Sequence, residues 1–522
     1  MPFAEVSLQD KEDGYSENRM GSHFVGVLRL CLAAAVLYAI MVLISGISQP
    51  LMDLPSFRQT QTALSVYWLV HGSHWLAYET PVLGAPWPVP FEFPLYQWIV
   101  AVLVKVGAPI DPAGRLVSFI FYVATLWPMH VFFRAARLGR IASLSTAILF
   151  MTAPLYLYYS RTFMIESCAL FFSVLALAFV AQYLWKRRLS SAIIAAAAGS
   201  AAILTKSTTF PAFATVATCL IAIEFSRYVW PRMNRAELRY VIAPIAALAI
   251  PFVIGVLWVY YSDQLKMNNE FGRMLTSAAL QHWTFGDNGQ RLSAALWHDV
   301  VYVRVLRELF GYGVPLALVV IGTGLARLRS SVATAIAAFG FVIPFLVFTS
   351  LHFVHGYYQY ANGIFALAAV GIGIGSVAKG RQFLLAGALL LALVLGQIAI
   401  FRTYRHKIKA DLSQNDRLRA AEFVRKTTPA DSAVLVFGDD WASHIPYYSR
   451  RKALVVPNWT PSPLVDRILA EPAAFLGNLK LGCVVLCRDG IKRYGDRSAP
   501  IEKFTAGREI KGEFGTCQVI AP

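Results

Sequence analysis

The sequence predicts an all-α membrane protein with about 11 spanning helices, plus helices in the membrane plane and a small C-terminal α/β domain. Hydrophobic residues make up 57% and charged residues 15% of the 522 residues, whereas a soluble chain carries roughly 25% charged residues. Long apolar runs recur from residue 24 to residue 401, and charges return at ordinary density only after residue 402. These observations exclude a disordered, a fibrous and a typical soluble protein.

Eleven apolar runs approach the roughly 20 residues that a helix needs to cross a bilayer. They are 24–47, 114–134, 140–158, 163–185, 189–205, 208–228, 238–261, 313–328, 331–350, 360–378 and 381–401. A twelfth run, 93–104, is too short to cross comfortably, so we expect it to lie in the plane of the membrane.

Basic residues fall in alternate loops, and this pattern predicts the orientation of the chain. The basic loops hold Arg134, Arg137 and Arg140; Lys186, Arg187 and Arg188; Arg227, Arg232, Arg235 and Arg239; Arg327 and Arg329; Lys379 and Arg381. Such loops stay in the cytoplasm. The N-terminal tail 1–23 is then cytoplasmic, and the loops 48–113 and 262–312 lie outside. The net charge of +17 is therefore an orientation signal and does not indicate nucleic-acid binding.

The C-terminal region, 402–522, is expected to be an extracytoplasmic α/β domain, in the periplasm if the membrane is a bacterial inner membrane. A helical pattern over 416–426 is followed by short strand-like runs at 433–437, 452–456, 483–486 and 517–520. An oxidising compartment permits a disulfide among Cys483, Cys487 and Cys517. Their odd number leaves at least one thiol unpaired, unless a second chain takes part.

Three carboxylates stand at the predicted outer boundary, namely Asp53, Glu92 and Glu166, whereas the spans themselves hold almost no acid. A carboxylate buried there needs a cation, a metal or a hydrogen-bond donor. As structural alternatives, Asp53 caps a helix that starts near Ser56, Glu92 pairs with a loop arginine, and Glu166 pairs with Arg161. Taken together, the three acids predict a site at the membrane surface, where a carboxylate can act as a general base.

Basic and aromatic side chains accompany these acids on the same face. Arg58, Arg161 and Lys206 could stabilise a departing phosphate, although Lys206 could equally extend along the helix to the interface. The turn from residue 352 to residue 360 holds His352, His355, Tyr357 and Tyr358. An aromatic belt at the interface is the alternative for this turn. Two histidines are unusual in such a belt, so a role in a cavity is favoured.

Short motifs occur in a fixed order along the membrane region: Asp53 after the first run, Glu92–Tyr96, Gly114–Leu116, Arg161 and Thr162 with Glu166, and Leu204–Lys206. This ordered set resembles the GT-C membrane glycosyltransferases, in the family 39-like branch that includes protein O-mannosyltransferases and lipid A aminoarabinose transferases. The His-Gly-Tyr-Tyr-Gln turn at 355–359 is similar to that of less studied bacterial members.

The resemblance implies an inverting transfer of a sugar from a polyprenyl-phosphate carrier to an extracytoplasmic hydroxyl on a lipid, a glycan or, with less support, a protein. It implies that Asp53 is the base and that Glu92 matches an acid that can bind a divalent metal ion, with no nucleotide cofactor. Two features depart from the family. The aminoarabinose transferases have Lys-Pro-Pro after this acid, whereas this chain has Phe93-Pro94-Leu95. The mannosyltransferases usually have paired acids after the first crossing, whereas this chain has only Asp53. A transporter or flippase of a lipid-linked saccharide is the alternative, but ion-coupled transporters usually carry acids at mid-membrane.

Overall fold

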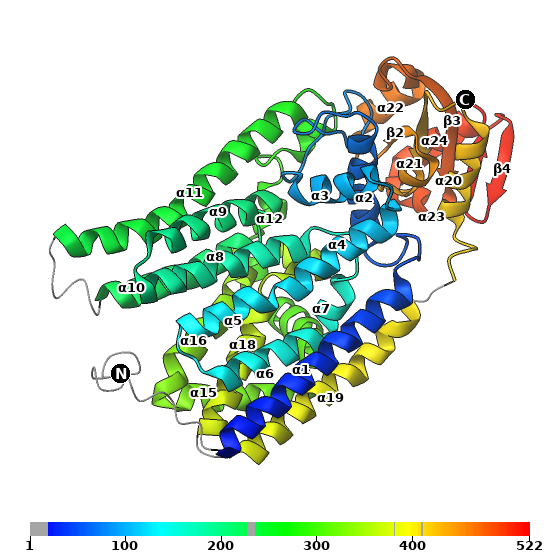
Figure 1. Ribbon diagram of the computed structural model, residues 1–522. Helices are drawn as coiled ribbons and strands as arrows, with labels where there is room; N and C mark the ends of the chain where they lie inside the picture. The colour runs from blue at the N-terminus through cyan, green and yellow to red at the C-terminus, as the bar shows by residue number, and fades with distance from the viewer. Residues whose placement is uncertain (1–18, 227–234, 380–381, 409–410) are drawn as a thin grey trace.

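The computed structural model describes residues 19–226, 235–379, 382–408 and 411–522. These residues form a large helical bundle with a small sheet-containing domain at one end (Figure 1). The predicted fold class is thereby confirmed. The predictions for residues 1–18, for the basic loop at 227–234 and for Arg381 fall outside the described residues.

The bundle is built from apolar helices, of which the longest run between its two ends (Figure 1). They are α1 (Arg19–Gly46), α4 (Ile110–Ala124), α5 (Leu126–Ala135), α6 (Arg140–Thr152), α7 (Pro154–Tyr159), α8 (Glu166–Lys186), α9 (Leu189–Thr205), α10 (Phe210–Glu224), α11 (Arg235–Lys266), α15 (Val314–Ala326), α16 (Leu328–Val347), α18 (Gly363–Lys379) and α19 (Phe383–Ile408).

Within the described residues, eight helical segments are long and apolar enough to cross a membrane, fewer than the 11 predicted. The other three predicted runs are shorter helices. The run 140–158 is divided between α6 and α7 because Pro154 interrupts the helix, while 189–205 and 208–228 correspond to α9 and α10. The run expected to lie in the membrane plane forms α3 (Leu95–Lys105), which is also among the short apolar helices.

The segment 262–312 differs from the predicted outer loop, because much of it is helical. Helix α11 continues to Lys266, and a π-helix η5 (Ala295–Leu306) leads into α14 (Arg307–Phe310), η6 (Gly311–Gly313) and α15. His298 and Asp299 lie on the exposed face of η5, while its apolar side packs inward. Because these polar residues interrupt the apolar pattern, the sequence did not indicate a helix here. Shorter helices complete the segment: η4 (Gly272–Leu275), α12 (Gln281–Phe285) and α13 (Asn288–Leu292).

The first outer loop carries α2 (Ser56–Val70) and α3, and each helix follows a proline. Pro55 and Pro94 occupy the N-cap positions, where a proline requires no intrahelical N–H bond. The predicted cap by Asp53 is not present, since α2 has no side-chain cap. The later turn forms α17 (Thr349–Val354) and η7 (Gly356–Tyr360).

The C-terminal domain is a five-stranded sheet in the order β2-β1-β3-β5-β4. Its elements are α20 (Asp416–Thr427), β1 (Ser432–Phe437), α21 (His444–Ser449), β2 (Lys452–Val455), α22 (Ser462–Ala470), η8 (Pro472–Phe475), β3 (Lys480–Cys487), α23 (Arg488–Ile491), η9 (Lys492–Arg497), α24 (Ser498–Thr505), β4 (Ile510–Phe514) and β5 (Cys517–Ile520). Four strands and α20 match the predicted runs. Only β4 was missed, because this edge strand is largely exposed and contains a glycine.

The cysteines of this domain follow the predicted odd count. Cys487 and Cys517 form a disulfide between the paired strands β3 and β5, and Cys483 stays a buried free thiol.

The domain is fixed to the first outer loop by polar and aromatic contacts. His444 on α21 hydrogen-bonds through Nε2 to Ser56 Oγ and through Nδ1 to Asp439 Oδ2, both at 3.0 Å. Burial alone would raise the pKa of Asp439, but the neighbouring His444 and Arg417 outweigh it and hold that pKa below its usual value. The Phe57 ring packs edge-on against Trp441. The first two residues of α2 therefore belong to the domain interface.

We predict that His444→Ala lowers the stability of the folded protein by about 1–3 kcal/mol, because it leaves a buried carboxylate and a hydroxyl without one partner each. The thermal unfolding midpoint of the purified protein in detergent measures this. The exposed His282 on α12 provides the control, and His282→Ala should leave the midpoint unchanged. Equal midpoints for both variants would show that the interface does not depend on His444.

Candidate active site

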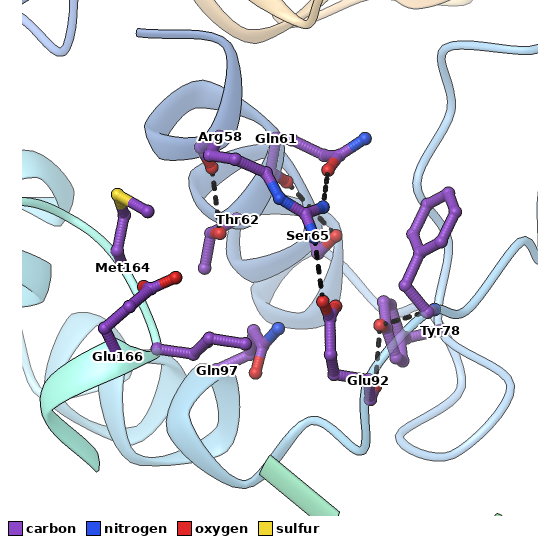
Figure 2. A pocket seen from close by; sticks show the side chains of 11 residues that line it. Arg58, Gln61, Thr62, Ser65, Tyr78, Glu92, Gln97, Met164 and Glu166 are labelled. Carbon is purple, nitrogen blue, oxygen red and sulfur yellow. Dashed lines mark hydrogen bonds and ion pairs between the residues drawn. The ribbon is translucent and has the colours of Figure 1, made fainter. Parts of the chain in front are cut away.

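A polar pocket lies where α2, the loop before α3 and the start of α8 meet (Figure 2). Four residues of α2 line it because residues three or four positions apart share one face of a helix. The lining residues are Arg58, Gln61, Thr62, Ser65, Tyr78, Phe91, Glu92, Gln97, Met164, Ile165 and Glu166. The pocket therefore contains two of the three predicted acids.

Arg58 and Glu92 form an ion pair at the centre of this pocket, with 2.9 Å between Nη2 and Oε1 (Figure 2). Their side chains are about one-fifth exposed, at 21% and 22%. Arg58 also donates a hydrogen bond to Gln61, one turn further along α2. The Tyr78 hydroxyl donates to the backbone oxygen of Glu92 and holds the loop in place. The predicted pairing of Glu92 with a loop arginine is thus present, and its partner is Arg58.

Glu166 and Lys206 form a second, deeper pair at 2.7 Å. The ammonium group of Lys206 also lies over the rings of Tyr358 and Tyr357, 4.2 and 5.0 Å from their centroids. Lys206 therefore points into the protein and does not extend to the interface. Among the described residues, the second oxygen of Glu166 has no hydrogen-bond partner although it is buried. The expected pair of Glu166 with Arg161 is absent, because Lys206 takes that place.

Asp53 lies outside this pocket in a buried cluster with two arginines. Arg115 Nη2 is 3.0 Å from Oδ1, and Arg161 Nη2 is 2.7 Å from Oδ2. Gln59 adds a hydrogen bond of 3.0 Å to Oδ1. Both arginine side chains are almost fully buried, at 0% and 1% exposed. In the sequence Arg115 is only the centre of a Gly-Arg-Leu motif, and nothing in that motif indicates that it pairs with Asp53.

The turn after α17 reaches the pocket through its tyrosines. The His355 ring stacks on Tyr357 at 5.0 Å, and Tyr357 stacks on Tyr358 at 5.0 Å. His352 instead packs against Phe345, with 4.5 Å between the ring centroids, and is buried. Burial, reinforced by nearby cations, lowers the pKa of His352 to about 3 and that of His355 to about 4. Both rings are neutral at ordinary pH.

The structure thus brings together six of the predicted residues and separates two others from them. Arg58, Glu92 and Glu166 line the pocket. Lys206 pairs with Glu166 and lies over Tyr357 and Tyr358, while Asp53 and Arg161 form the adjacent cluster. Sequence reasoning missed Gln61, Ser65 and Gln97. For Gln61 and Ser65, the spacing from Arg58 could have indicated that all three share one face of a helix.

Comparisons with known proteins bear on this arrangement. A sequence model of the family described as dolichyl-phosphate-mannose-protein mannosyltransferase matches residues 88–258. The chain is similar in structure to ArnT from Cupriavidus metallidurans bound to undecaprenyl phosphate, with a TM-score of 0.62 and 14% identity, over 95% of this chain and 98% of that chain. The chain has the GT-C glycosyltransferase fold. The predicted resemblance is confirmed.

Two further GT-C structures extend the likeness. The archaeal oligosaccharyltransferase AglB from Archaeoglobus fulgidus, in complex with an inhibitory peptide and a dolichol-phosphate, has a TM-score of 0.52 and 12% identity, over 94% of this chain and 74% of that chain. The arabinofuranosyltransferase AftD from Mycobacteria has a TM-score of 0.58 and 12% identity, over 94% of this chain and 40% of that chain. A search of curated proteins gave no match.

The described residues of this pocket do not form a ligand set for a metal ion. Among the described residues, no three His, Cys, Asp or Glu side chains gather closely enough to hold one. Glu92, the expected ligand, is paired with Arg58. An AglB structure is a complex with zinc and sulfate.

We predict that the stability of the protein falls as pH drops from about 6.5, the ordinary histidine value, to about 4, the pKa of folded His355. The unfolded chain binds a proton on this ring over that range and the folded chain does not. His355→Gln should flatten the dependence of the unfolding midpoint on pH, whereas His282→Gln should not. An unchanged slope in His355→Gln would mean that this ring is not buried as described.

Proposed function

We propose that this protein transfers a sugar from a polyprenyl-phosphate donor to an acceptor hydroxyl at the outer face of the membrane, with inversion at the anomeric carbon. The observation that carries the proposal is a pocket at the end of the bundle that is lined by Arg58, Glu92 and Glu166, with Lys206 paired to Glu166. Arg58 and Lys206 can receive the carrier phosphate as negative charge grows on it. ArnT and AglB have been solved with undecaprenyl phosphate and with a dolichol-phosphate, respectively.

The position of the pocket follows from helix α8. This helix begins at Glu166 in the pocket and ends at Lys186, next to the basic turn of Arg187 and Arg188. Its 21 residues span roughly 30 Å, which is the thickness of the hydrocarbon core. The pocket and the basic turn therefore lie on opposite sides of a bilayer. Because basic turns stay in the cytoplasm, the pocket faces outward, and we place the protein in a bacterial inner membrane.

In the proposed reaction the acceptor oxygen attacks the anomeric carbon from the side opposite the phosphate. The bond from that carbon to the phosphate oxygen breaks, and its electron pair stays on the phosphate. We assign the acceptor proton to Asp53. Both oxygens of Asp53 are engaged by arginines, so this role requires one pair to open. Arg161 could then turn from Asp53 to the incoming phosphate, for which its planar guanidinium is suited.

The function itself is tested in a deletion strain. Mass analysis of its envelope lipids and glycans should reveal one missing sugar together with its attachment point. Accumulation of the lipid-linked saccharide at the cytoplasmic face of the membrane, with no glycosidic bond that fails to form, would instead favour a flippase.

We predict that Asp53→Asn lowers sugar transfer at least about 100-fold, the usual contribution of a general base. Restoration of the missing glycan in the deletion strain measures transfer, and undecaprenyl phosphate binding to the purified variant serves as the folding control. Glu166→Gln is the comparison, since Glu166 lines the pocket and one of its oxygens has no hydrogen-bond partner among the residues that the structure describes. If Glu166→Gln loses transfer and Asp53→Asn keeps it, the base is Glu166.

We also predict that the C-terminal domain and the basic turn after α8 are labelled from opposite sides of the membrane. In a Cys31→Ser background, Glu502→Cys on the exposed surface of α24 should react with a membrane-impermeant maleimide added to intact spheroplasts. Arg188→Cys should react only after the membrane is permeabilised. The reverse pattern would overturn the orientation.

A further inference from the structure

A second cavity lies beside the Asp53 cluster and belongs to none of the predicted sites. Its walls are Leu54, Pro154, Leu155, Tyr158, Tyr159, Arg304, Glu308, Gly356 and Tyr404. An adjoining cavity shares Arg304, Glu308 and Tyr404 with it. The two measure about 210 and 280 Å³, many times the roughly 15 Å³ that admits one water molecule. The space is large enough for a sugar ring.

The π-helix η5 supplies the charged wall of this cavity. Arg304 lies near the end of η5, and Glu308 follows four residues later in α14. π-Helices are rare and occur frequently at functional sites. Arg304 donates hydrogen bonds to the backbone oxygens of His352 and Phe353, which fixes its direction. Its Nε is buried and makes no hydrogen bond within the described part of the chain.

Tyrosines supply the rest of the wall. Tyr158 and Tyr159 come from α7, and the Tyr404 hydroxyl on α19 donates to Glu308 Oε1 at 3.2 Å. Gly356 lets the turn approach, since a Cβ there would lie 3.0 Å from the Tyr159 hydroxyl. The cavity thus offers aromatic faces, phenol groups, a carboxylate and a guanidinium. This mixture suits a ligand that carries several hydroxyl groups, which both donate and accept hydrogen bonds.

The cavity also contacts both parts of the candidate active site. Leu54 follows Asp53 directly, and its carbonyl accepts a 2.7 Å hydrogen bond from the Tyr158 hydroxyl. The guanidinium of Arg161, which pairs with Asp53, lies 4.7 Å from the Tyr158 ring centroid. On the other wall the Tyr159 ring meets Tyr357 at 6.5 Å, and Tyr357 lies against Lys206. Asp53 is thus linked to the cavity wall through Tyr158 and Arg161, and Lys206 through Tyr159 and Tyr357. Arg58 lines only the first pocket.

We infer that this second cavity binds the acceptor, and that the acceptor is a saccharide. This inference rests on the proposed transferase function. Arg304 and Glu308 are the specificity-determining contacts to the acceptor's hydroxyl groups, while the donor phosphate occupies the pocket of Arg58 and Lys206.

The test separates acceptor binding from donor binding. Arg304→Gln, Glu308→Gln and Tyr404→Phe are each expressed in the deletion strain, and the restored glycan is quantified. Each purified variant is also titrated with undecaprenyl phosphate and followed by native mass spectrometry. We expect the product to fall at least about tenfold, as for a lost hydrogen bond to a charged group, with carrier affinity unchanged. Arg58→Gln should lose both, and Asp299→Asn, on the exposed face of η5, should lose neither.

Two results would overturn the inference. Loss of undecaprenyl phosphate binding in folded Glu308→Gln and Tyr404→Phe would assign the cavity to the donor. Full restoration of the glycan by all three variants would show that the acceptor binds elsewhere. Failure of the function itself looks different, since no glycan would then be missing from the deletion strain.

Discussion

The end of the bundle that carries the C-terminal domain depends on one buried charge cluster, formed by Asp53, Arg115 and Arg161. These residues come from the first outer loop, from α4 and from the turn before α8. Arg115 additionally donates to the backbone oxygens of Gly46 and Pro50, so the cluster also fixes the end of α1. Removing one partner of a buried ion pair costs about 3–5 kcal/mol, because the other charge stays buried and uncompensated. In the proposed reaction, a movement of Arg161 would therefore need a replacement anion, and the carrier phosphate is the group that would supply it.

Helix α2 turns this anchoring into a functional site, because each of its faces meets a different part of the protein. Ser56 and Phe57 contact the C-terminal domain, Gln59 contacts Asp53, and Arg58 and Gln61 face the pocket. The periodicity of a helix makes this division unavoidable, since adjacent residues point about 100° apart. A shift of the C-terminal domain would therefore move Arg58 together with Asp53.

Much of this arrangement could be predicted from the sequence, because the relevant signals are local. The apolar runs gave the helices, and the buried strands of the C-terminal domain appeared as short apolar runs. The orientation drawn from the basic turns stays a prediction. The pairing of charges could not be predicted. Arg161 is only five residues from Glu166 but pairs with Asp53, while Glu166 reaches Lys206, 40 residues away. Those choices depend on how helices pack, and a single sequence holds no such distances.

The segment 295–308 shows the same limit from the opposite direction. Its polar residues favour a loop in the sequence. In the structure some of them face water and others face the protein interior. A π-helix shifts the register of side chains relative to an α-helix, so a pattern with a period of 3.6 residues does not identify its inward face. The periodicity of the sequence therefore did not indicate that Arg304 and Glu308 line the cavity.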